Sequence, residues 1–139
     1  MPNLFQPEIA HDVAAQQHVR GWAAALRSDE YPQASGTLRT TSGFCCLGVA
    51  CDRFNDSIWR RGTEGADWSY LGASIDLPRP VMDAYRLRSP HGHYDVESDG
   101  PDEPAARSLA DDNDSGKTFA EIANAIEREL EAALGSPGR

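Results

Sequence analysis

The sequence predicts an α+β fold with three main helices, near residues 10–28, 44–54 and 118–133, and a small β element. The first and last of these segments carry apolar residues spaced three and four apart, which is typical of amphipathic helices. The middle segment is apolar or small at almost every position, which indicates burial on most sides. We therefore expect a buried central helix that packs against the other two.

The first helix is predicted within residues 8–28, where Val19, Trp22 and Leu26 fall on one face. A proline and a glycine follow and end the helical stretch. Residues 36–43 then place β-branched residues between two glycines, a pattern that predicts a short strand or one arm of a hairpin.

The central helix is predicted from eight consecutive apolar or small residues at positions 44–51. Gly48 would allow another element to approach this helix closely, because it has no Cβ. Ser42 or Gly43 is the expected N-cap.

The segment after the central helix has weaker signals. Trp68-Ser-Tyr-Leu predicts a short strand. Residues 77–87 predict a short helix with Pro80 in its first turn, where a missing N–H costs nothing, and with Val81 facing inward. Residues 88–105 combine acids with prolines and glycines and are predicted to form an acidic loop.

The last helix has the clearest start signal. Thr118 and Glu121 fit a capping box, in which the two side chains bond reciprocally to backbone N–H groups, and an apolar stripe follows. We expect a single domain over residues 1–139, with residues 1–7 and 135–139 frayed at its ends.

The net charge of −9 is unevenly distributed along the chain. Residues 1–61 hold six acids and six arginines, so residues 62–139 carry the whole excess. An acidic surface repels nucleic-acid phosphate and anionic lipid, so we expect no direct nucleic-acid binding and no membrane association. The absence of a secretory signal pattern and of an apolar run near ~18 residues predicts a cytoplasmic protein.

The chain has three cysteines, Cys45, Cys46 and Cys51, in a Cys-Cys-x4-Cys pattern. An odd number without a signal peptide argues against a disulfide framework. The spacing is not that of a zinc signature, and we expect neither a metal nor a cofactor. Free cysteine is among the most frequently buried residue types, so we favour core positions for these side chains.

A nucleophilic thiol is the alternative interpretation of this cluster. Cys45 lies nearest the predicted helix start, where the helix dipole and free N–H groups would stabilise a thiolate. His91 or His93 as the base and Asp95 as the third member would then complete a triad in the order Cys, His, Asp. Such a site would belong to a papain-like or transglutaminase-like hydrolase or transferase.

Residues 111–118, Asp-Asp-Asn-Asp-Ser-Gly-Lys-Thr, predict a turn ahead of the last helix, with the glycine at positive φ. They also resemble the start of a calcium loop, but Ile122 occupies the position of the bidentate glutamate. Free N–H groups at a helix N-terminus beside a lysine make a candidate anion site. The residues assigned to it are Asn113, Asp114, Gly116, Lys117, Arg20 and Arg39.

Six arginines in the charge-balanced half form a further candidate set. If several converge, they would bind a nucleotide or phosphate ligand through bidentate hydrogen bonds; otherwise they are solvated side chains on helix faces. The set is Arg20, Arg27, Arg39, Arg53, Arg60 and Arg61.

Several sequence blocks follow one another along the chain: Trp22-Ala-Ala-Ala-Leu-Arg-Ser, Tyr31-Pro-Gln, Gly43-Phe-Cys-Cys-Leu-Gly-Val and Leu109-Ala-Asp-Asp-Asn-Asp-Ser-Gly-Lys-Thr-Phe. Over residues 22–126 they resemble a family of small proteins common in bacteriophages and prophages. The chain departs from that pattern at Asp29, where glycine is usual, and at Asp112, where leucine is usual. The resemblance implies a phage-type accessory protein in a bacterial host cell and implies no reaction.

Three classes of function remain open. We favour an interaction protein that inhibits or sequesters a host component, either by docking to a host or phage protein or by binding a small nucleotide signal. Small size, acidity and the absence of a complete catalytic motif in the sequence fit this class. The alternatives are the cysteine-dependent enzyme and a structural accessory protein without a catalytic site.

Overall fold

The computed structural model describes residues 3–61, 68–96 and 105–135. The described residues form the α-helices α1 (Val13–Arg27), α2 (Cys46–Phe54), α3 (Arg79–Ala84), α4 (Leu109–Asp114) and α5 (Phe119–Leu134). They also form the 3-10 helices η1 (Pro7–His11) and η2 (Asp56–Ile58) and the strands β1 (Trp59–Arg61), β2 (Trp68–Tyr70), β3 (His93–Val96) and β4 (Ala105–Ser108). The fold is mixed α+β, as the sequence predicts.

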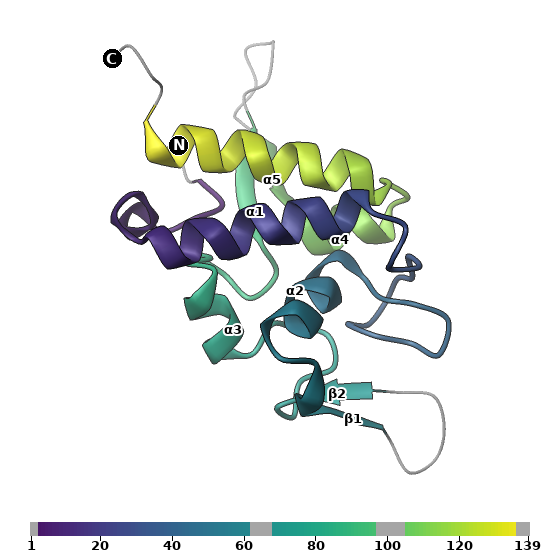
Figure 1. The fold of residues 1–139 in the computed structure, drawn as a ribbon. Coiled ribbons are helices and arrows are strands. Elements are labelled where there is room, and N and C mark those ends of the chain that lie inside the picture. Colours follow the sequence, from purple (N-terminus) through teal and green to yellow (C-terminus); the bar gives the residue numbers. More distant parts are fainter. Residues whose placement is uncertain (1–2, 62–67, 97–104, 136–139) are drawn as a thin grey trace.

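The two long helices α1 and α5 lie side by side and run in opposite directions (Figure 1). Val19, Trp22 and Leu26 of α1 are buried, and so are Ile122 and Ile126 of α5. These are the residues of the two predicted apolar stripes, so both amphipathic helices are confirmed. Burial of apolar stripes such as these is a major hydrophobic contribution to folding.

Side-chain caps set the first residue of both long helices. Asp12 accepts a hydrogen bond from the backbone N–H of Ala15 at 3.0 Å, so α1 begins at Val13, later than predicted. The capping box of Thr118 and Glu121 is complete, and α5 begins where the sequence places it.

The central helix α2 is buried as predicted. Residues 46–51 are all buried, and a Cβ added to Gly48 would lie 1.8 Å from the backbone oxygen of Leu38. The predicted packing partner was wrong in part, because α2 packs mainly against α1, α3 and α4, whereas α5 packs on α1. Its glycine allows the loop before it to lie directly on the helix.

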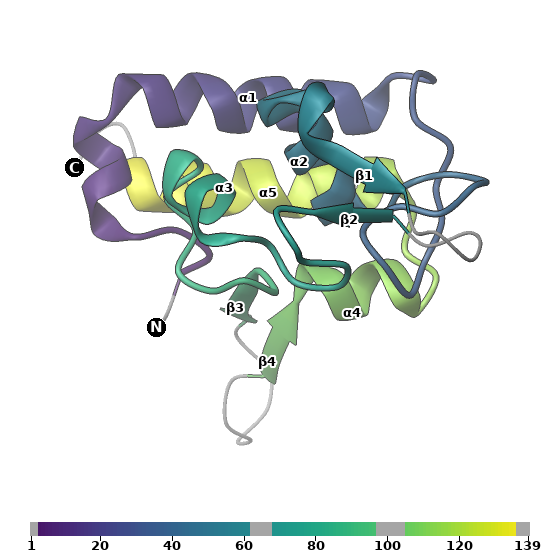
Figure 2. The same cartoon turned by 90° about the horizontal axis from the view of Figure 1, so that it is seen from below.

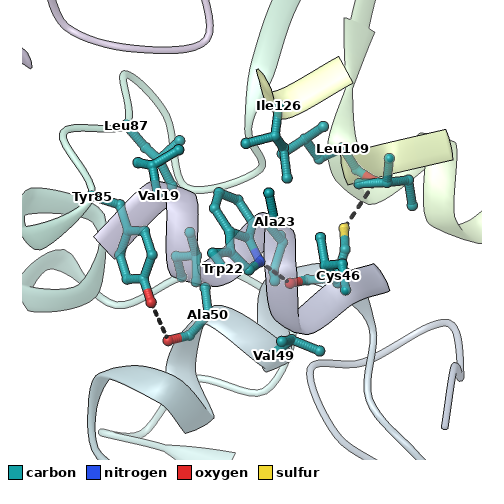
Figure 3. Packing of buried hydrophobic residues seen from close by; sticks show 14 of the residues in the cluster. Val19, Trp22, Ala23, Cys46, Val49, Ala50, Tyr85, Leu87, Leu109 and Ile126 are labelled. Carbon is teal, nitrogen blue, oxygen red and sulfur yellow. Dashed lines mark hydrogen bonds between the residues drawn. The ribbon is translucent and has the colours of Figure 1, made fainter. Parts of the chain in front are cut away.

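Two aromatic side chains hold α2 through their polar atoms (Figure 3). Trp22 Nε1 donates to the carbonyl oxygen of Cys46 at 2.9 Å, and Tyr85 Oη donates to that of Ala50 at 3.0 Å. The two rings meet edge to face, with centroids 5.3 Å apart. The polar atom of each buried aromatic side chain therefore has a hydrogen-bond partner on α2, the helix against which the ring packs.

The N-cap of α2 is Cys45, not Ser42 or Gly43, since the Cys45 Sγ accepts from the backbone N–H of Gly48 at 3.4 Å. The backbone N–H groups of Ser42 and Gly43 instead bond to the hydroxyl of Thr40, each at 3.1 Å. A hydroxyl that bonds nearby backbone groups competes with regular structure, and this local turn also interrupts the predicted strand.

Two separate antiparallel strand pairs make up the β element. In β1–β2, Trp59 lies opposite Tyr70, and in β3–β4, His93 lies opposite Ser108. The β1–β2 pair lies on the side of α2 away from the α1–α5 layer (Figures 1 and 2). The short strand predicted from Trp68 is confirmed as β2.

Two predictions for irregular segments need correction. Residues 36–43 form no strand; Arg39 makes only an isolated antiparallel bridge to Phe44. The acidic loop predicted over residues 88–105 is interrupted by β3 and by the start of β4. Most of its acids fall in residues 97–104, which lie outside the described residues.

The short helix α3 is confirmed, with Pro80 in its first turn and Val81 buried. The N-terminal segment is bound more tightly than predicted. Leu4 is fully buried, and its backbone N–H donates to Glu129 Oε1 at 3.0 Å. The predicted fraying of residues 1–7 is therefore wrong at Leu4. Residues 1–2 and 136–139, for which fraying is also predicted, lie outside the described residues.

Candidate functional site

Asn113 lies in the last turn of α4 and is only 4% exposed. The turn predicted over residues 111–118 is therefore wrong for residues 111–114, which are helical. Its Oδ1 accepts from Gln33 Nε2 at 3.0 Å and from the backbone N–H of Cys46 at 3.2 Å. Its Nδ2 donates to the backbone oxygen of Ala34 at 2.7 Å. One amide thus joins α4, the loop at residues 33–34 and the start of α2. We call Asn113 and its three partners, Gln33, Ala34 and Cys46, the clasp.

Further hydrogen bonds extend from the clasp to the rest of the turn. Gln33 Nε2 also donates to the backbone oxygen of Lys117 at 2.8 Å, and the N–H of Gly36 donates to Asp114 Oδ1 at 3.0 Å. Gly116 has a φ of 107°, which confirms the positive φ predicted for it. The polar groups of this turn are largely used within the fold.

A shallow hollow of about 230 Å³ borders the clasp and is lined by Gln33, Ala34, Ser35, Asn113, Gly116 and Lys117. Lys117 is half-buried and forms no ion pair among the described residues. Asp114, next to the hollow, is exposed and adds a negative charge. Lys117 is thus the one cationic side chain that lines the hollow.

The two arginines assigned to this site do not join the turn. Arg20 is exposed on α1. The guanidinium carbon of Arg39 lies 3.8 Å from the centroid of the Trp68 ring and 4.9 Å from that of Phe44. Neither arginine lines the hollow beside Lys117, so the predicted six-residue site separates into distinct parts.

The three thiols are free and buried, as predicted for core positions. Burial raises the pKa of the Cys45 thiol to about 11, since desolvation outweighs the backbone N–H groups at the helix start. Burial also raises the pKa values of Cys46 and Cys51. The Cys46 thiol donates to the backbone oxygen of Leu109 at 3.4 Å (Figure 3). An activated nucleophile needs a lowered thiol pKa, and these shifts run the other way.

The candidate histidine bases have other partners. His91 Nδ1 lies 3.1 Å from Asp76 Oδ1, and His93 Nδ1 lies 3.0 Å from Ser89 Oγ. Asp95 belongs to β3, and its side chain is outside the described atoms. No hydrogen bond brings an imidazole to a thiol in the described residues, and no group of three metal-ligating side chains occurs among them.

A cluster that we did not predict gathers around Trp68. Arg61 lies opposite Trp68 in the β1–β2 register, and its guanidinium carbon is 5.7 Å from the Trp68 ring centroid. Arg39 covers the same ring, so two of the six candidate arginines do converge. We call Arg39, Arg61 and Trp68 the Trp68 platform. The sequence signal for it is a pair of tryptophans, Trp59 and Trp68, with Arg60 and Arg61 directly after the first.

No helix in the described part of the chain is long and apolar enough to cross a membrane. Neither the curated proteins nor the solved structures contain a match to the chain. A family model does match residues 15–130, and its description is "Domain of unknown function (DUF8296)". The matched region includes most of α1, all of α2–α4, the clasp, the Trp68 platform and most of α5. The chain therefore belongs to the DUF8296 family.

Proposed function

We propose that this protein is a phage-type accessory protein that docks onto a host protein in the bacterial cytoplasm and thereby inhibits or sequesters it. The observation that carries this proposal is a pair of large apolar side chains left in solvent beyond β2. Leu71 is 52% exposed and Ile75 is 56% exposed. Neighbouring exposed apolar side chains are typical of surfaces that a partner covers.

The backbone at Leu71 strengthens this argument. Tyr70 and Ala73 exchange backbone hydrogen bonds of 2.7 and 2.9 Å around Leu71 and Gly72, which have φ values of 52° and 87°. This is a type I′ turn, whose first central position favours asparagine, aspartate or glycine. A leucine there costs roughly 1–2 kcal/mol and recovers little of it by burial. Burial by a partner would account for the choice.

The thiols and the hollow support docking over the other functions. The raised thiol pKa values and the histidine contacts disfavour a cysteine-dependent enzyme. A nucleotide is a less suitable ligand than a protein, because the hollow of about 230 Å³ at the clasp is below the ~300–1,000 Å³ of typical small-molecule sites. Lys117 is also the one cationic side chain in the lining of this hollow.

Photo-crosslinking in bacterial cells tests the proposal. A photoreactive phenylalanine analogue is placed at Leu71, at Ile75, and at Val13 as the control, which is 64% exposed at the start of α1. We expect one host protein to crosslink from both Leu71 and Ile75 and not from Val13. That protein, once purified, should bind the wild-type chain in calorimetry with saturable stoichiometry.

Two outcomes would contradict docking. One is that Leu71 and Ile75 give no common product, or only products that Val13 also gives. The other is that the purified crosslinked protein does not bind the chain in solution. Either result would favour the structural accessory role, which requires no partner at this surface.

A further inference from the structure

The Trp68 platform presents two guanidinium groups to one indole ring. The guanidinium carbons of Arg39 and Arg61 lie 3.8 and 5.7 Å from the centroid of the Trp68 ring. Arg39 also covers the ring of Trp59 at 5.4 Å. Trp68 and Arg39 are half-buried and Arg61 is exposed, so solvent reaches the group.

The arginines of the platform differ from the ion-paired arginines in what their guanidinium groups contact. Arg27, Arg86 and Arg107 each form an ion pair with a carboxylate. Among the described residues, Arg39 and Arg61 contact aromatic rings and form no ion pair. Two like charges beside one ring repel each other, and an anion placed between them would relieve that repulsion.

Stacking on an aromatic ring also leaves the hydrogen-bond donors of a guanidinium available. The N–H groups lie in the guanidinium plane, so they point past the ring and match the two oxygens of a carboxylate or phosphate. The indole holds the side chain of Arg39 in place, which reduces the entropy lost when it binds a ligand. The geometry is that of a prepared anion site.

The backbone beside the platform lies next to the segment that carries Ile75. The backbone N–H of Leu38, next to Arg39, donates to the oxygen of Ser74 at 2.7 Å. Ile75 follows Ser74 and borders a small crevice whose lining also includes Thr37 and Asp114. One hydrogen bond therefore brings the chain before Arg39 next to the chain before Ile75.

We infer that the Trp68 platform binds an acidic segment of the partner protein, with carboxylates at Arg39 and Arg61 and an adjacent aliphatic side chain toward Ile75. This inference rests on the proposed docking function and names the chemistry of the partner. Trp and Arg are the residue types that most often dominate binding energy at protein interfaces.

A nucleic acid fits this surface less well than an acidic peptide. Duplex DNA carries a phosphate charge about every 1.7 Å along its axis, so it would extend beyond two arginines onto a chain of net charge −9. An acidic segment has to place only one or two carboxylates at the platform. The apolar side chain of Ile75 also has no partner on a phosphate backbone.

The test is a selection of random peptides displayed on yeast against the purified protein. We expect the selected peptides to combine aspartate or glutamate with leucine, isoleucine or phenylalanine. A fluorescein-labelled synthetic copy of one peptide is then titrated with each variant, and its anisotropy is measured. Replacing the peptide's acids by their amides should weaken binding about tenfold, as loss of a charged hydrogen bond does.

Arg61→Gln and Arg39→Gln should each weaken peptide binding about tenfold, while Arg60→Gln should leave it unchanged. Arg60 is the matched control, because it is an exposed neighbour on β1 that faces Ser69 and contacts no ring. Because Arg61 is exposed, Arg61→Gln should leave the fold intact. It therefore still tests peptide binding if Arg39→Gln lowers the melting temperature.

Three results would overturn the inference: selected peptides without acidic enrichment, equal losses for Arg60→Gln and Arg61→Gln, or oligothymidylate binding more tightly than the peptide. The crosslinking experiment separates this failure from failure of the docking function. A host protein that crosslinks at Leu71 and binds Arg61→Gln as well as wild type leaves docking intact and removes the platform from it.

Discussion

The clasp differs from the hairpin region, which comprises β1, β2 and residues 71–75, in how far its side chains are buried and bonded within the fold. Asn113 in the clasp is 4% exposed and all its described contacts lie within the fold. In the hairpin region, Leu71 and Ile75 are more than half exposed, and Arg61 forms no ion pair among the described residues.

This difference shows that a distinctive motif can serve the fold rather than a ligand. The Asn-Asp-x-Gly block attracted the binding hypothesis because of its turn chemistry and its lysine, yet its amide is occupied by Gln33 and Cys46. The hairpin region has no comparable motif, but it exposes two apolar side chains and an arginine that forms no ion pair among the described residues. Unsatisfied groups are better indicators of a partner than unusual sequence is.

Asn113→Ala gives the largest expected effect and tests whether the clasp is structural. The variant leaves the N–H of Cys46 and the carbonyl of Ala34 without this partner in a buried place. The free energy of unfolding should fall by about 3 kcal/mol, measured by urea denaturation. Asp111→Asn, at an exposed position of α4, should change it by less than about 0.5 kcal/mol. A loss below about 1 kcal/mol for Asn113→Ala would mean that the clasp contributes little.

Alkaline titration tests whether the thiol beside the clasp is sealed in the core. Burial raises the Cys45 pKa from 9.0 to about 11, so between these values the unfolded chain loses a proton that the folded chain keeps. This contribution to stability is fully present below pH 9 and is lost as pH rises through 11, by about 3 kcal/mol in total. Denaturation measured across this range should show a shallower decline for Cys45→Ala than for wild type. Equal slopes would mean that the thiol is accessible to solvent.

Leu71→Asn tests whether a leucine at this position of the turn lowers the stability of the fold. Asparagine tolerates the positive φ of this turn, so the variant should be more stable than wild type by up to about 1 kcal/mol in thermal unfolding. Leu71→Ala, which keeps the unfavourable backbone and removes the side chain, should not be more stable than wild type. If Leu71→Asn is clearly destabilised, the leucine side chain serves the core and the contrast with the clasp disappears.

Lys117→Ala gives the smallest expected effect and examines the clasp as a ligand site. Because Lys117 has no ion pair within the described residues, its removal should change stability by less than about 0.5 kcal/mol. We also expect no cyclic or linear nucleotide to raise the melting temperature of the wild-type protein. A nucleotide at a hundred times its Kd would add about 2.7 kcal/mol. Such a shift in wild type but not in Lys117→Ala would make the hollow a nucleotide site.

Local patterns predicted the elements whose signals lie within a few residues. Thr118 and Glu121 marked the start of α5, and the spacing of Val19, Trp22 and Leu26 marked the buried face of α1. The strand predicted at residues 36–43 failed because the hydroxyl of Thr40 bonds nearby N–H groups. β propensity alone does not take account of such local hydrogen bonds between side chain and backbone.

The candidate sites were less predictable, because they combine residues far apart in the chain. Arg61 and Trp68 are brought together by one hairpin, but Arg39 comes from a loop that reaches them only after folding. In the same way, the link between Gln33 and Asn113 spans 80 positions. Spacing along the sequence contains no direct signal for such contacts.

The sequence by itself determined the three main helices, the burial of α2 and the helix start at Thr118, since periodicity and caps act over one or two helical turns. Only the tertiary structure decided that α5 packs on α1, that Asn113 closes the clasp, and that two arginines share the Trp68 ring. The physical reason is that many apolar surfaces are compatible with one another. Which of them meet is decided by the packing of the whole chain.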